Sequence, residues 1–194
     1  MSKPDAGTAK KERNKTIRWV VTIFLVTILI SGTISFTSDL LMANSTMLVA
    51  FIILLIIVLI GIAFDIIGVA VTSADEKPFH SMAARKVPGA QESIRLLRNA
   101  ERVSSICNDV IGDICGVVSG SASATIAAQV LKNFELTFEN LIPLVMSALV
   151  AGLTVGGKAM GKTVAMNSCT QIVHGVGKII WFFRVKNKNK KKRN

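Results

Sequence analysis

"MLVAFIILLIIVLIGIAF", residues 47–64, is a run of eighteen residues without a charged side chain. The run continues to residue 72 with Asp65 as its one acid. A helix needs about 20 apolar residues to cross the hydrocarbon core of a bilayer. The stretch therefore predicts a membrane-spanning helix over 47–72.

Three further apolar segments have comparable length, at residues 19–36, 106–131 and 141–157. The first follows a basic lead-in, as a secretory signal does. Its apolar part is too long for a signal and no small-residue cleavage site follows directly, so we interpret it as a retained helix. The sequence thus predicts an all-α membrane protein with four transmembrane helices.

The net charge of +11 comes from Lys and Arg residues concentrated in three places, residues 3–18, 77–102 and 178–193. These groups flank the apolar segments, so no nucleic-acid partner is expected. By the positive-inside rule we expect both termini on the cytoplasmic side, in the plasma membrane. Residues 1–16 are predicted to be disordered. The tail, 185–194, is predicted to lie on anionic lipid headgroups.

The connector at 73–103 predicts a cytoplasmic helical hairpin, with short helices at about 79–86 and 90–99 and a turn at "VPGA", residues 87–90. Residues 164–184 carry apolar side chains at helical spacing and end near Trp181 and Arg184. This pattern predicts an in-plane amphipathic helix. The three cysteines include no C-x-x-C pair and predict neither a disulfide framework nor a zinc site.

Acidic residues interrupt two of the apolar segments. Asp109 and Asp113 are four residues apart and share one helix face. An ionised carboxylate at the bilayer centre costs about 2.5 kcal/mol or more. We expect this face and the Asp65 face of the second span to turn toward one another. Small residues at four-residue spacing favour close helix packing and a homodimer; they are Gly112, Gly116 and Gly120.

Oxygen ligands without histidine or thiolate partners suit hard cations, Mg²⁺, Ca²⁺ or Mn²⁺, and Na⁺ stays open. The candidate metal ligands are Asp65, Asn108, Asp109 and Asp113. In the fourth segment, "GGKAMGK" at 156–162 is expected to interrupt the helix. Its Lys158 and Lys162 are one turn apart. They either neutralise the acids or reach out to the headgroups.

Four stretches match one known pattern. "FDIIG", 64–68, ends an apolar helix; Gly89-Ala90 precedes "LLRNAER", 96–102; Cys107-Asn108 opens the next helix; and "GKAMGKT" occupies 157–163. Through them residues 51–184 resemble the membrane domain of the cyclin M and CorC/CorB family (domain of unknown function 21), whose members are associated with magnesium transport.

The resemblance implies a homodimeric domain in which small polar side chains and backbone carbonyls hold a largely dehydrated Mg²⁺. It implies a ligand role for Asn108, structural roles for Lys162 and Thr163, and a place near the ion for Asp65, where the family has serine. Two family glutamates and one proline are replaced here, by Gly68, Lys158 and Gly161. The paired CBS regulatory domains that usually follow are not in this sequence, so we expect no gating by cytosolic nucleotide.

These observations predict divalent-cation transport, most simply of Mg²⁺, through an intramembrane site of Asp, Asn and Ser oxygens. One alternative is a membrane interaction protein that transports nothing and whose acids pair with lysines. Another is a transporter linked to protons or Na⁺. No enzymatic activity is expected, because no nucleophile, base and orienting group occur together at one depth.

Overall fold

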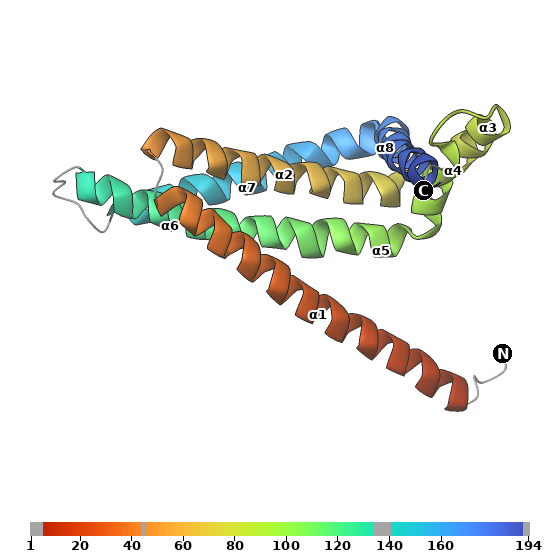
Figure 1. Ribbon diagram of the computed structural model, residues 1–194, viewed down its shortest axis with the longest axis horizontal. Helices are drawn as coiled ribbons and strands as arrows, with labels where there is room; N and C mark the ends of the chain where they lie inside the picture. The colour runs from red at the N-terminus through yellow and green to blue at the C-terminus, as the bar shows by residue number, and fades with distance from the viewer. Residues whose placement is uncertain (1–5, 44–45, 134–140, 192–194) are drawn as a thin grey trace.

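The computed structural model describes residues 6–43, 46–133 and 141–191, and these residues form helices joined by short connections (Figure 1). The bundle consists of α2 (Met47–Ser73), α6 (Asp113–Asn133) and α7 (Leu141–Asn167), each of which packs against the other two. A fourth long helix, α1 (Ala6–Ala43), crosses α6 at an angle.

Four helical stretches in the described residues are long and apolar enough to cross a membrane. They are Ile17–Ser38, Met47–Ser73, Ala100–Lys132 and Leu141–Asn167. The all-helical class and the number of candidate spans predicted from the sequence are therefore confirmed.

The fourth span is longer than predicted. We expected it to end at residue 157 and to lose its helical form in "GGKAMGK", but α7 is continuous to Asn167. Gly157 and Gly161 pack so tightly against Ile62 and Ile66 of α2 that a methyl group at either glycine would overlap those side chains. This contact holds the segment as a helix despite its two lysines.

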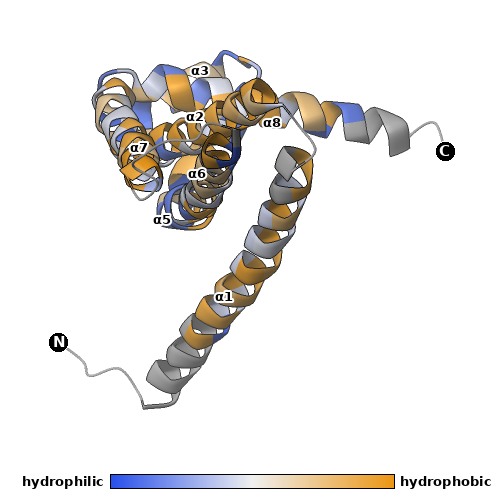
Figure 2. Cartoon of the chain, turned by 90° about the vertical axis from the view of Figure 1, so that its left-hand side faces the viewer, coloured by the Kyte–Doolittle hydropathy of each residue, from blue (hydrophilic) through white to orange (hydrophobic). Residues whose placement is uncertain are grey.

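The first helix also differs from the prediction. It begins at Ala6, so the predicted disorder is wrong for residues 6–16, whereas residues 1–5 lie outside the described part. Extending an existing helix adds one hydrogen bond for each residue fixed, and residues 9–12, Ala-Lys-Lys-Glu, are good helix formers. The helix leans away from the bundle (Figure 2), and Ile23 packs against a cluster of Val110, Ile114 and Val118.

A group of shorter elements closes one end of the bundle. Here lie α3 (Lys77–Ala84), α4 (Ala90–Arg98) and α5 (Ala100–Ser105), and the predicted turn between the first two is confirmed. Lys86 and Gly89 in this turn have positive φ angles of 58° and 88°. The last helix, α8 (Cys169–Lys191), runs across this end; it starts later than predicted and includes the tail as far as Lys191.

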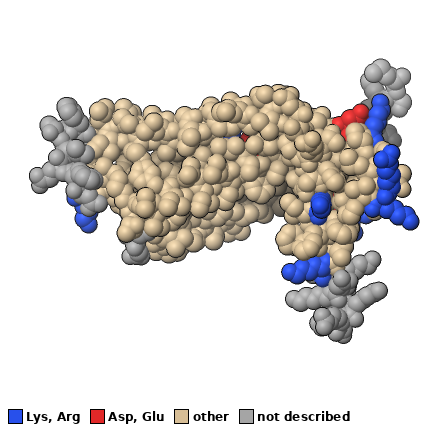
Figure 3. Space-filling view, turned by 90° about the horizontal axis from the view of Figure 1, so that it is seen from above, with Lys and Arg blue, Asp and Glu red and all other residues tan. Residues whose placement is uncertain are grey.

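A hydrophobic cluster joins the end group to the bundle. Phe79 of α3 and Val173 of α8 are fully buried beside Ala70 and Val71 of α2. On the face that Figure 3 shows, Lys and Arg side chains gather mainly at this same end, and most of the surface between the ends carries no charged side chain. We call the end of the molecule at α3, α4 and α8, where these Lys and Arg side chains gather, the basic end.

Candidate functional site

The third span is not a regular α-helix throughout. Between α5 and α6 the chain forms a π-helix, η1 (Ile106–Gly112), which packs against α2. A π-helical turn is wider than an α-helical one, and such turns occur frequently at functional sites. Two of the predicted ligands, Asn108 and Asp109, lie in this element.

Asn108 points into the contact between η1 and α2. Its Nδ2 donates a hydrogen bond to Ser104 Oγ over 3.2 Å. Its Oδ1 is buried and has no hydrogen-bond partner. The amide lies directly on the backbone of Gly68, where a methyl group would overlap it. Buried polar atoms are nearly always hydrogen-bonded, so an unpartnered oxygen calls for a physical reason.

Asp65 lies one helical turn before Gly68 on α2. Its Oδ1 is 3.4 Å from Nζ of Lys158 on α7, and the two side chains are 17% and 28% exposed. The ammonium also lies beside Gly112, whose missing side chain leaves room for it: a Cβ there would be 3.4 Å from Nζ. We call Asp65, Gly68, Asn108, Gly112 and Lys158 the polar layer.

The remaining two acids do not join the polar layer. Asp109 and Asp113 are exposed, and Asp109 Oδ2 accepts a hydrogen bond from Ser105 Oγ over 2.8 Å. The expectation that their face turns toward Asp65 is therefore wrong. The third span instead buries its apolar positions, Cys107, Val110, Ile114 and Val118. In the described part of the chain, no three His, Cys, Asp or Glu side chains are grouped as metal ligands.

The other predicted residues also lie outside the layer. Lys162 and Thr163 are exposed, and Lys162 takes part in none of the ion pairs among the described residues. Gly116 and Gly120 have no atom within 4 Å of where a Cβ would be, so the small-residue face stays uncovered in the single chain.

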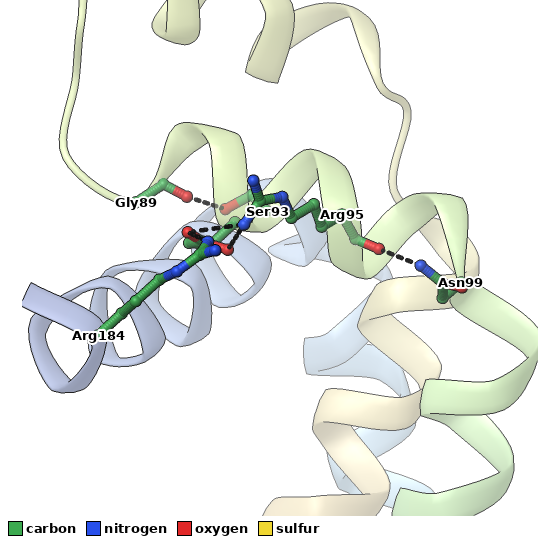
Figure 4. Close-up of polar contacts among 6 residues, drawn as sticks. Gly89, Ser93, Arg95, Asn99 and Arg184 are labelled. Atoms are coloured by element: carbon green, nitrogen blue, oxygen red, sulfur yellow. Dashed lines mark hydrogen bonds and ion pairs between the residues drawn. The ribbon is translucent and has the colours of Figure 1, made fainter. Parts of the chain in front are cut away.

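A second polar cluster joins α4 to α8 and was not predicted from the sequence (Figure 4). Glu92 accepts hydrogen bonds from Arg184 over 2.6 Å and from Arg95 over 3.0 Å. Ser93 Oγ lies 3.0 Å from the Gly89 carbonyl oxygen and 3.2 Å from that of Val173. The spacing of Glu92 and Arg95 could have suggested their pair, but Arg184 is too distant in sequence. We call this cluster the α4–α8 contact.

Glycines make the approach of these two helices possible. A methyl group at Gly177 would overlap Ser93 Oγ, and one at Gly89 would be 2.6 Å from the backbone nitrogen of Lys178. His174 of α8 has Nε2 3.2 Å from the carbonyl oxygen of Pro88. The α4–α8 contact therefore depends on the close approach of the two helix backbones as well as on the ion pairs.

No protein-family model matches the chain, and no curated protein or solved structure matches it.

Proposed function

We propose that the protein transports a divalent cation, most simply Mg²⁺, across a membrane through the polar layer. One observation carries the proposal: Asn108 Oδ1 is buried without a partner in a π-helical turn, against the face of α2 that bears Asp65. Amide and carboxylate oxygens are the ligands that hard cations take, and Mg²⁺ keeps several waters beside one or two protein oxygens. Asp65 and Asn108 would supply those two.

Lys158 has a defined part in this proposal. Its ammonium lies 3.4 Å from Asp65, where it supplies the positive charge that the carboxylate requires in a low-dielectric setting. A divalent ion entering the layer would take over this place, and Lys158 would turn away. Lys158 and the ion would therefore compete for the same carboxylate, that of Asp65.

The proposed setting is the plasma membrane, with the basic end of the molecule on the cytoplasmic side. In that orientation α3, α4 and α8 lie at the inner headgroups, where the exposed apolar side chains of α8 would enter the interface; these include Ile179, Phe182 and Phe183. The basic residues of the tail would contact anionic lipid.

A homodimer forms part of the same proposal. Asp109 and Asp113 share an exposed face with Gly116 and Gly120, and lipid would surround these carboxylates in a single chain. A second copy packed on this face would remove them from lipid, and the glycines would allow the two helices to approach closely.

The Asp65–Lys158 pair also favours a second function, that of a membrane interaction protein that transports nothing. In that case the pair is only structural, and breaking it by removing one partner costs about 3 kcal/mol or more. The two functions differ in the wild type, which carries Mg²⁺ only under the first; the double variant then shows whether Asp65 is a ligand.

The test measures Mg²⁺ entry into proteoliposomes that contain a fluorescent indicator, for the wild type, Asp65→Asn, Lys158→Gln and the double variant. Thermal unfolding in detergent is measured for the same four proteins, and Asp75→Asn, an exposed acid between α2 and α3, is the matched control.

If the proposal is right, the double variant recovers the stability that each single variant loses but does not recover flux. Wild-type and Asp75→Asn proteins carry Mg²⁺ equally. If the double variant recovers both stability and flux, Asp65 is not a ligand. Flux that follows a pH or Na⁺ gradient without Mg²⁺ would show a different cargo, and a silent wild type would favour the interaction protein.

A further inference from the structure

A second site lies between α1 and α5 at the basic end of the molecule, away from the polar layer. An open pocket of about 450 Å³ is lined by Arg18, Trp19 and Thr22 of α1 and by Arg102 of α5. None of these residues belongs to the polar layer or to the α4–α8 contact.

Neither arginine of the pocket is paired with a carboxylate among the described residues, and an aromatic ring orients one of them, Arg102. The guanidinium carbon of Arg102 lies 5.6 Å from the centroid of the Trp19 ring, a cation–π contact that orients the group. The ion pairs among the described residues involve Glu76, Glu92 and Asp65, so neither Arg18 nor Arg102 has a carboxylate partner there.

The lining has no acceptor of its own that would satisfy two guanidinium groups. Thr22 Oγ1 donates its proton to the carbonyl oxygen of Arg18 over 2.7 Å. Glu101 precedes Arg102 and lines with it a neighbouring pocket, on the side of Arg98. None of the ion pairs among the described residues joins the two. Two unpaired guanidinium groups in one pocket match an anion that has several oxygens, and phosphate accepts the bidentate hydrogen bonds that arginine offers.

The pocket is also placed at the depth of a lipid headgroup. Arg18 and Trp19 stand at the start of the apolar stretch of α1, Ile17–Ser38, and tryptophan is enriched at membrane interfaces. The apolar side chains that follow are exposed, among them Val20, Val21 and Phe24. They offer a surface along which acyl chains can lie.

We infer that Arg18, Arg102 and Trp19 form a binding site for the phosphate of an anionic phospholipid, which ties α1 to α5. The lipid bridges two helices that otherwise share few contacts at this end. Soluble phosphate has the same chemistry, and the test below separates it from the lipid.

The experiment is native mass spectrometry of the full chain in detergent with phosphatidylglycerol or phosphatidylcholine, for the wild type and Arg18→Gln/Arg102→Gln. The control, Lys77→Gln/Arg85→Gln, removes the same charge from α3 and from the residue that follows it, outside the pocket. Arg18→Lys/Arg102→Lys keeps the charge and removes the planar guanidinium groups. Unfolding is measured for each variant.

We expect the wild type and the control to retain phosphatidylglycerol in preference to phosphatidylcholine. We expect affinity to fall by about tenfold or more in Arg18→Gln/Arg102→Gln and by less in the lysine variant. A second measurement uses Trp181→Phe protein, in which Trp19 is the one remaining tryptophan. Brominated phosphatidylglycerol should quench its fluorescence.

Equal loss of lipid from Arg18→Gln/Arg102→Gln and from the α3 control would overturn the inference, because bulk charge would then explain binding. Quenching that is the same with and without the two arginines would overturn it as well. If inorganic phosphate alone displaces the lipid, with the same dependence on Arg18 and Arg102, the ligand of the site is soluble phosphate. The assignment to a phospholipid is then wrong.

Discussion

The polar layer and the α4–α8 contact both place a carboxylate beside a basic side chain, yet they differ in how completely their polar groups are satisfied. At the α4–α8 contact, Glu92 is bonded by two arginines and Ser93 lies within hydrogen-bond distance of two carbonyl oxygens. In the polar layer, Asp65 has one lysine, and Asn108 Oδ1 has no partner.

The difference separates what supports the fold from what the molecule can bind. A fully satisfied polar network holds helices in one arrangement, whereas a buried oxygen without a partner is a place where a ligand gains a contact at no cost to the fold. We therefore expect changes at the α4–α8 contact to alter stability without altering transport. Changes in the polar layer should reduce transport, either with or without a loss of stability.

The largest effect on stability is expected for Gly89→Ala. At a φ of 88° the new side chain is strained, and its Cβ would be 2.6 Å from the backbone nitrogen of Lys178. Strain of about 1 kcal/mol and overpacking of about 2 kcal/mol add to about 3 kcal/mol. Unfolding in detergent and hydrogen exchange in α8 measure it. Gly175→Ala, with nothing within 4 Å, is the control; equal losses in the two variants would refute the proposed cause.

A smaller loss, about 2 kcal/mol, is expected for Gly68→Ala, because the methyl group overlaps the Asn108 amide. Since the obstacle is one side chain, Gly68→Ala/Asn108→Ala should recover most of the stability while transport stays lost. Unfolding and Mg²⁺ flux are measured on the same preparations. If the double variant is less stable than Gly68→Ala, the overlap is not the reason for the loss.

Glu92→Gln should cost about 1.5 kcal/mol, since the hydrogen bonds to two arginines lose their charge-assisted part. Flux per folded molecule should equal that of the wild type. Unfolding and proteoliposome assays on matched amounts of protein measure the two quantities. A loss of flux in Glu92→Gln that exceeds the loss of folded protein would contradict the proposal that the α4–α8 contact supports only the fold.

The smallest effect on the fold is expected for Gly116→Leu, because no atom lies within 4 Å of a Cβ at that position. Its free energy of unfolding should change by less than about 0.5 kcal/mol. Association of two copies in vesicles, followed by energy transfer between labelled chains, should weaken. Gly152→Leu on α7 is the matched control, also with nothing within 4 Å. Equal association in both variants would argue against the proposed dimer face.

Much of the fold follows from features local in sequence. The uninterrupted apolar run fixes α2, and "VPGA" marks the turn at Gly89, because spans and turns depend on neighbouring residues. Helix periodicity also places Asp109 and Asp113 on one face. Which face meets α2 depends on packing between helices, and here Val110 and Ile114 are buried whereas both acids are exposed.

The candidate site was harder to predict from the sequence, because it also depends on packing between helices. Asp65 and Asn108 were recognisable as polar residues in apolar segments, but the π-helical turn and the unpartnered oxygen arise only when η1 packs against Gly68. The continuation of α7 past Lys158 likewise depends on Ile62 and Ile66 of another helix. Contacts between distant segments carry this information, and no local pattern contains it.

The most direct test of the polar layer is Mg²⁺ flux for Asn108→Ala, compared with Asn99→Ala, an exposed asparagine whose Nδ2 bonds the Arg95 carbonyl oxygen. Each variant loses one side-chain hydrogen bond, so each should lose about 1 kcal/mol of stability. We predict that flux falls at least about tenfold in Asn108→Ala, the equivalent of losing about 1.4 kcal/mol of ion stabilisation, and is unchanged in Asn99→Ala. Flux that is equal in the two variants, or absent from the wild type, would contradict a cation site at Asn108.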